Sequence, residues 1–148
     1  WFDEGITKAL GVFLGGVTQA ANHYLLFGEV DNTPASNWEL KSNGTGLHIR
    51  DAAVFGEFTD YDETARVTWA YDAAASKSIA NATTVATITC NNAVPDTVYG
   101  ACLVSVSNKA GTADDTGYAV AGKKFSTAIP ASTGNEIKVT HTLSGTAA

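Results

Sequence analysis

The chain has 148 residues, of which 45% are hydrophobic and 16% charged, and its formal net charge is −6. A chain of this length buries about two-thirds of its unfolded surface, enough for one core without metals or disulfides. The small charged fraction excludes a disordered polymer, and the acidic balance lacks the basic footprint of nucleic-acid binding.

No membrane partner is expected, because no apolar run approaches the roughly 20 residues needed to cross a bilayer. No secretory signal is expected either, since Asp3 and Glu4 stand where a signal peptide would be basic. The chain begins at Trp1 and contains no methionine. We therefore expect that residues ahead of Trp1 have been trimmed or left out.

Residues 3–17 (DEGITKALGVFLGGV) have the period of an amphipathic helix that Asp3 can cap and Gly15–Gly16 can end. Its apolar stripe must pack either on the chain's own β domain or on another subunit. We define residues 1–20 as an N-terminal arm. The expected interface residues of this arm are Trp1, Phe2, Ile6, Leu10, Phe13 and Leu14, and Val17 continues the stripe.

Residues 21–148 are predicted to form a single β domain. Strands are predicted at 23–30, 47–50, 53–58, 64–71, 84–90, 98–106, 118–125 and 137–143. In 64–71, alternation places Val67, Trp69 and Tyr71 inward and Arg66 and Thr68 outward. Strands with turns between them favour an antiparallel β-sandwich of jelly-roll or immunoglobulin-like type, preceded by one short N-terminal α-helix.

Residues 84–106 are the predicted centre of the domain. The run 98–106 is apolar on both faces, with Val98, Cys102 and Val104 on one of them, so it is predicted to lie mid-sheet. A turn at Pro95–Asp96 predicts a hairpin of 84–90 and 98–106, in which Cys90 would face Cys102. The two cysteines are then either a disulfide or two buried thiols, and the lack of a secretory signal favours thiols.

No motif indicates reactive chemistry. His23, His48 and His141 lack zinc-ligand spacing, and Asp60, Asp62 and Glu63 lack the length of an EF-hand, so we predict a solvated acidic loop. There is no nucleophile elbow and no phosphate loop. The glycosylation sequons at Asn43 and Asn81 are expected by chance. We predict no catalytic residues, no metal and no cofactor.

Read from end to end, the chain resembles small virion proteins of tailed bacteriophages. The resemblance is carried by the helix ending in ALGVFLGG, by the strand and Thr-Pro turn of HYLLFGEVDNTP, and by the segment DYDETARVTWAY. It continues through NATTVATITC, VYGACLVSVSNKAGT and the closing pattern that ends in IKVTHTLSG. The resemblance implies a non-enzymatic structural protein, above all a capsid cement or decoration protein of a phage head.

The resemblance also implies where the protein works and with what. It would be made in the host cytoplasm and sit on the capsid surface of the virion, bound as a homo-oligomer to the major capsid protein or to sister copies. An acidic outer surface would keep released genomes from adhering to it. The alternative is a tail or fibre accessory module that binds host-surface glycans through a platform at Trp38 and the loops at 31–46 and 107–117.

Overall fold

The computed structural model describes residues 22–31, 56–109 and 119–144, and all regular elements in these ranges are β-strands. The strands are β1 (Tyr24–Gly28), β2 (Val67–Thr68), β3 (Ser78–Ala80), β4 (Ala86–Thr89), β5 (Asp96–Val104), β6 (Ala119–Ala131), β7 (Glu136–Val139) and β8 (Thr142–Ser144). Every strand pair is antiparallel. The prediction of a mainly β, antiparallel fold is confirmed. The predicted helix of residues 3–17 and the predicted strand at 47–50 lie outside the described residues.

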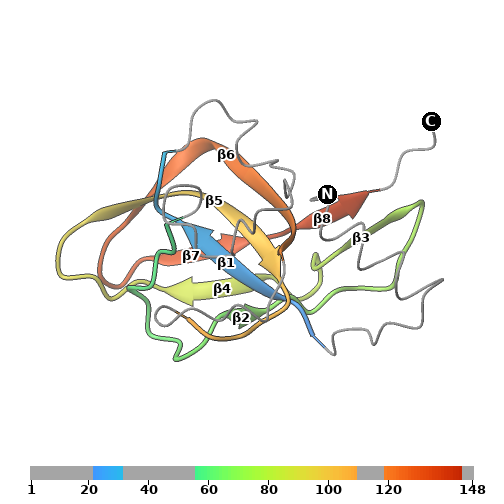
Figure 1. The fold of residues 1–148 in the computed structure, drawn as a ribbon, viewed down its shortest axis with the longest axis horizontal. Coiled ribbons are helices and arrows are strands. Elements are labelled where there is room, and N and C mark those ends of the chain that lie inside the picture. The colour runs from blue at the N-terminus through green and yellow to red at the C-terminus, as the bar shows by residue number, and fades with distance from the viewer. Residues whose placement is uncertain (1–21, 32–55, 110–118, 145–148) are drawn as a thin grey trace, which may run out of the picture.

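The strands form a four-stranded sheet in the order β2-β1-β5-β6 and two two-stranded sheets, β4–β7 and β3–β8 (Figure 1). β5 lies between β1 and β6, and Leu103 stands opposite Leu25 on one side and Ala121 on the other. Its residues are buried on both faces. The prediction that this run lies mid-sheet is therefore confirmed.

The predicted hairpin of 84–90 and 98–106 is wrong. β4 pairs with β7, with Ile88 opposite Ile137, whereas β5 pairs with β1 and β6. Asn92 explains the crossover, because its buried amide Nδ2 donates to the carbonyl oxygens of Val94 (2.6 Å) and Ala131 (3.0 Å). The Pro95–Asp96 turn thus connects two different sheets. Because the hairpin does not form, the expectation that Cys90 faces Cys102 is also wrong.

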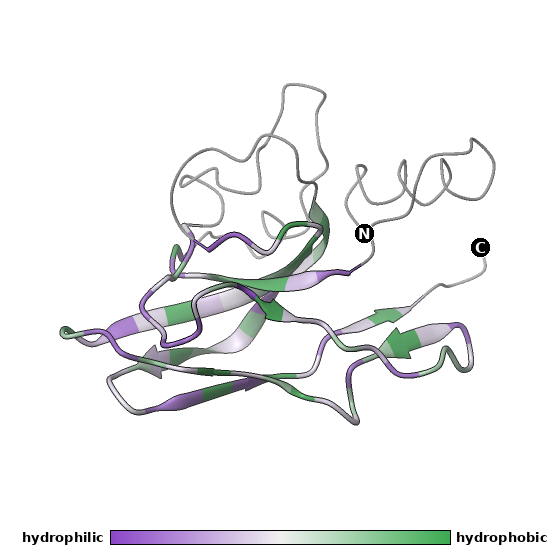
Figure 2. Ribbon diagram, turned by 90° about the horizontal axis from the view of Figure 1, so that it is seen from below, coloured by the Kyte–Doolittle hydropathy of each residue, from purple (hydrophilic) through white to green (hydrophobic). Residues whose placement is uncertain are grey.

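The main hydrophobic core lies between the four-stranded sheet and the strands of the two smaller sheets (Figure 2). It combines Leu25 and Phe27 of β1 with Ile88 of β4, Ile137 of β7 and residues of β5, β6 and β8. Tyr61 joins it with edge-on and tilted contacts to Phe27 and Phe58, each 6.2 Å between ring centroids. One continuous cluster therefore holds strands of all three sheets together.

The strand predicted at 64–71 is mostly irregular, since only Val67 and Thr68 pair in β2. Trp69 is buried as predicted, and its indole nitrogen donates to the carbonyl oxygen of His141 at 3.1 Å. Two orientations were wrong. Tyr71 is 51% exposed and Arg66 only 2% exposed, because the chain leaves the regular strand after Thr68 and because Arg66 has a buried partner.

The last predicted strand, 137–143, is split into β7 and β8, which belong to different sheets. The break falls at Thr140 and His141, where the backbone amide of His141 bonds to the side chain of Asn81 and not to a strand. β8 pairs with β3, where the sequence analysis predicted no strand. A buried side chain thus ends one strand and begins the next.

The second face of the four-stranded sheet carries its own hydrophobic cluster, here called the Cys102 face. The buried members are Leu26, Cys102, Val104 and Ala119, and Tyr24, Tyr99 and Val106 pack against them. A register shift between Val98 and Gly100 turns Val98 away from this face into the main core, so its predicted pairing with Cys102 and Val104 was wrong. Within the described ranges there is no helix long and apolar enough to span a membrane.

Candidate functional site

A groove of about 610 Å³ opens between strands β5 and β6 and the β7–β8 segment. Small side chains at Ala101 and Ala121 leave this space open between the layers. The remaining lining residues are Gly122, Lys123, Phe125, Val139, Thr140, His141, Thr142 and Ser144. The volume lies in the range of small-molecule pockets, so this is a place where the described residues could hold a ligand.

The groove has the chemistry of a binding site. Its titratable groups are His141 and Lys123, and no carboxylate belongs to its lining. Burial lowers the pKa of His141, so the imidazole is neutral at neutral pH. The hydroxyls of Thr140 and Thr142 suit polar contacts to a ligand. Sequence analysis missed this groove, because its residues come from four strands with no shared motif.

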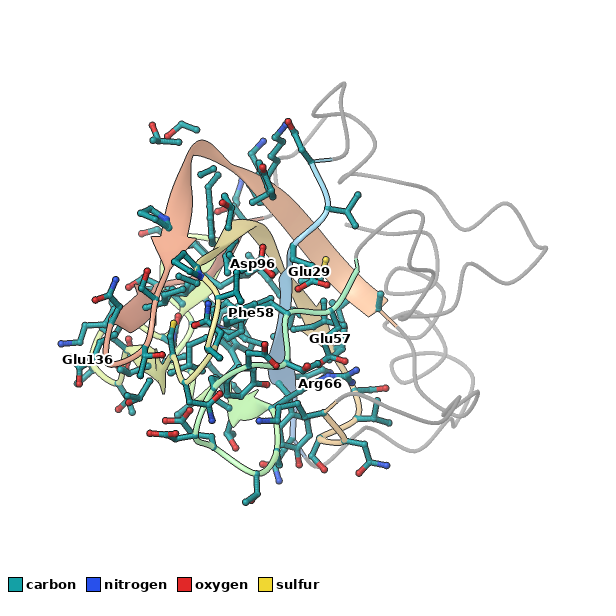
Figure 3. The ribbon with its side chains drawn as sticks, turned by 90° about the vertical axis from the view of Figure 1, so that its left-hand side faces the viewer. Glu29, Glu57, Phe58, Arg66, Asp96 and Glu136 are labelled. Carbon is teal, nitrogen blue, oxygen red and sulfur yellow. The ribbon has the colours of Figure 1, made fainter. Side chains whose placement is uncertain are left out.

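Arg66 and Glu57 form a buried ion pair (Figure 3). Two parallel bonds join them, Nε to Oε1 at 2.7 Å and Nη2 to Oε2 at 2.9 Å. The remaining guanidinium nitrogen, Nη1, donates to the carbonyl oxygen of Val106 at 3.0 Å. These hydrogen bonds therefore connect Arg66, just before β2, to Glu57, which follows β1 in the chain, and to Val106, which follows β5. The ion pair has a structural role, because the side chain of Arg66 is 0% exposed and that of Glu57 only 6% exposed.

Asn81 is fully buried and links β3 to the β7–β8 break. Its Oδ1 accepts from the backbone amide of His141 at 2.7 Å, and its Nδ2 donates to the carbonyl oxygen of Val139 at 3.0 Å. The amide nitrogen of this sequon is thus occupied inside the folded chain and cannot accept a glycan there. The other sequon, at Asn43, lies outside the described residues.

The acidic loop at 60–63 is bound to the end of β4. The Asp62 carboxylate accepts from Asn91 Nδ2 at 3.1 Å, and the Glu63 carboxylate from the backbone amide of Thr89 at 3.3 Å. No cluster of three or more His, Cys, Asp or Glu suited to a metal ion occurs in the described part of the chain. These two hydrogen bonds therefore attach the acidic loop to the C-terminal end of β4.

Both cysteines are free and buried. Cys90 belongs to the main core and Cys102 to the opposite face of the four-stranded sheet, so they lie in different clusters. Burial raises the pKa of each thiol, which keeps both in the unreactive protonated form. The predicted arm residues Trp1, Phe2, Ile6, Leu10, Phe13 and Leu14, the predicted glycan platform Trp38, and His48 all lie outside the described residues.

Glu29 gives a test of electrostatics at the end of β1, where Figure 3 shows it beside Asp96. Burial raises its pKa, and the Asp96 carboxylate, which shares a hydrogen bond with it, raises it further. The folded state thus holds this proton more tightly than the unfolded state. The contribution of Glu29 to the free energy of unfolding is therefore most favourable at pH values below its pKa in the unfolded chain. This contribution falls as the pH rises through the raised pKa of Glu29 in the folded state.

Glu29→Gln is accordingly expected to raise the melting temperature at pH 7 and to leave it unchanged near pH 3.5. Glu136→Gln is the matched control, because the Glu136 side chain is 54% exposed. Melting curves of both variants and the parent across this pH range check the expectation. A Glu29→Gln variant less stable than the parent at pH 7 would contradict it.

A comparison with known protein families finds no matching family model, and a comparison with curated proteins finds no matching relative.

Proposed function

We propose that this protein is a non-enzymatic virion structural protein, a cement or decoration protein that stabilises a phage head lattice. Its body is an antiparallel β-sandwich of jelly-roll or immunoglobulin-like type, preceded by the arm helix of residues 3–17. Its partners are the major capsid protein and sister copies, and it acts as a homo-oligomer on the capsid surface. It uses no catalytic residue and no cofactor.

The observation that carries the proposal is the arrangement of strand edges. Among the eight described strands, only β1 and β5 have a strand neighbour on both sides. A strand at the edge of a sheet offers backbone donors and acceptors to another chain, and proteins that work alone usually cover or shorten such edges. Two short two-stranded sheets and an edge strand as long as β6 among the described strands support a role in which neighbouring molecules pair with these edges.

Exposed apolar side chains support the same role. Val94, at the crossover between β4 and β5, is 75% exposed. Tyr71, whose ring packs at a tilt against Trp69 with ring centroids 5.2 Å apart, is 51% exposed. Apolar side chains of this kind gain free energy when a partner covers them. The chain's acidic balance of −6 suits an outer surface that must not bind the genome.

Three of the four buried polar side chains among the described residues, all except His141, favour a structural role over a catalytic one. Arg66, Asn81 and Asn92 each bind backbone or a counter-charge across the fold. None of them belongs to the groove lining. The guanidinium of Arg66, the amide of Asn81 and the Nδ2 of Asn92 are spent on joining segments of the chain, which suits a rigid part of a lattice.

The number of copies in the virion tests the proposal. A cement protein is expected in a fixed ratio to the major capsid protein, because each copy occupies an equivalent position of the lattice. Quantitative mass spectrometry of purified particles gives this ratio. A handful of copies per particle, independent of the number of capsid subunits, would overturn the cement role in favour of a place on the tail.

The groove is the observation that favours the alternative, a tail or fibre module that binds host glycans. Its hydroxyl-bearing residues, Thr140, Thr142 and Ser144, beside the ring of Phe125, are the side chains that contact sugars. A glycan array with the parent chain, Trp38→Ala and the groove-filling Ala121→Leu distinguishes the two functions. A reproducible hit that either substitution abolishes supports the glycan module, and its absence supports the cement protein.

A further inference from the structure

The wall that β6 gives to the groove is apolar at its floor and charged at its rim. Ala121 and Lys123 lie on the same face of β6, because side chains alternate along a strand. Lys123 stands opposite Ala101 of β5. Ala101 and Ala121 belong to the main hydrophobic core and are 1% and 6% exposed, whereas Lys123 is exposed. This wall therefore combines a floor of small side chains with an ammonium group beside it.

The opposite wall, from the β7–β8 segment, carries hydroxyl groups. In β8, Thr142 and Ser144 are exposed and alternate with Leu143, which is buried in the main core. Thr140, at the break between β7 and β8, is exposed as well. All three hydroxyl-bearing residues line the groove. Hydroxyl donors on the wall across from an ammonium group suit an oxyanion, which accepts several hydrogen bonds at once.

Charge selects the class of ligand. Lys123 carries the positive charge of the lining, and burial lowers the pKa of the His141 imidazole, which is neutral at neutral pH. No Asp or Glu lines the groove in the part of the chain that the structure describes. A cation would therefore meet an ammonium group and no counter-charge. A single negative charge is matched by Lys123, whereas a second one would lose water without gaining a partner.

We propose that the groove binds a small monocarboxylate with an apolar body. The carboxylate lies at Lys123 and accepts hydrogen bonds from the hydroxyl groups of the opposite wall. The apolar body covers Ala101 and Ala121 and packs beside the ring of Phe125. A volume of about 610 Å³ is sufficient for such a ligand. The inference goes beyond both virion roles, because neither gives the ligand of the groove a charge, and it can fail while either role stands.

Phenylacetate and its neutral isostere phenylacetamide test the proposal. Each is titrated into full-length protein, and binding is followed by NMR through the backbone amide signals of residues 139–144. Phenylacetate is expected to bind saturably, and phenylacetamide about tenfold more weakly, because hydrogen bonds to a charged group are the stronger ones. Inorganic phosphate, which has no apolar body to cover the alanine floor, is likewise expected to bind more weakly than phenylacetate.

Substitutions at Lys123 give the second measurement. Lys123→Met is expected to lower the affinity for phenylacetate about tenfold, to that of the amide. Lys123→Arg is expected to retain most of the affinity, because the guanidinium keeps the charge. Lys138→Met is the matched control, since Lys138 is 60% exposed and does not line the groove. Melting curves establish that each variant is folded.

Three results would overturn the proposal. The first is equal affinity for phenylacetate and phenylacetamide, or saturable binding of neither. The second is a Lys123→Met variant that binds phenylacetate as the parent does, or a loss equally large in Lys138→Met. The third is phosphate binding at least as tight as that of phenylacetate, which would show a site for simple anions without an apolar subsite.

Discussion

Arg66→Met is expected to lower the free energy of unfolding by about 3–5 kcal/mol, the cost of removing one member of a buried ion pair. The Glu57 carboxylate, 6% exposed, would then be buried without its counter-charge, and the carbonyl oxygen of Val106 would lose its donor from Nη1. Methionine keeps the length of the apolar stem, so lost packing adds little. Urea unfolding followed by tryptophan fluorescence measures the change.

Two further variants separate the charge from the packing. Glu57→Gln combined with Arg66→Met is expected to recover a large part of the loss, because a neutral amide in place of the carboxylate removes most of the desolvation penalty. Lys138→Met is the matched surface control. Its pair with Glu136 is exposed, at 60% and 54%, so its removal is expected to cost less than about 1 kcal/mol. An Arg66→Met loss as small as that of the control would show that the buried pair does not hold these segments.

Asn81→Ala is expected to lower the free energy of unfolding by about 2–6 kcal/mol, since it leaves two buried backbone groups unpaired at about 1–3 kcal/mol each. These groups are the amide of His141 and the carbonyl of Val139. Because both lie where β7 gives way to β8, hydrogen exchange at residues 139–144 is expected to rise as well. Asn91→Ala is the control, as Asn91 is exposed and its side chain bonds the exposed Asp62 side chain. Equal losses for the two variants would contradict the structural role of Asn81.

Much of the fold could be predicted because it follows from local patterns. The apolar runs around Leu26 and around Cys102 are buried on both faces, and a strand with that property has to lie inside a sheet. The burial of Trp69 followed from alternation along its segment in the same way. These predictions needed no knowledge of which strand lies beside which.

Strand pairing could not be predicted in the same way. The Pro95–Asp96 signal marks a change of direction, and a hairpin and a crossover between sheets both begin with one. The choice is made by Asn92, whose side chain reaches Ala131 far along the chain. The split of the last strand likewise depends on Asn81, which lies 60 residues before His141. Single polar side chains that act over such separations leave no local pattern.

The candidate site was missed for a related reason. The groove is formed where Ala101 and Ala121 face the segment around His141, and neither alanine differs from an ordinary core residue in sequence. Arg66 was predicted to point outward because the alternation of 64–71 assumed a regular strand. Its buried partner Glu57 sits in an isolated bridge with Gly28, a pairing that no periodicity indicates.

The central claim is that this β body completes and reinforces a larger shell. The most direct measurement adds purified full-length protein to phage particles whose own copy of the gene has been deleted. Bound protein per particle and the temperature at which the heads break open are then recorded. The account predicts saturable binding at a fixed ratio to the capsid subunits together with a higher breaking temperature. Heads that bind none of the protein and break at the same temperature with and without it would contradict the account.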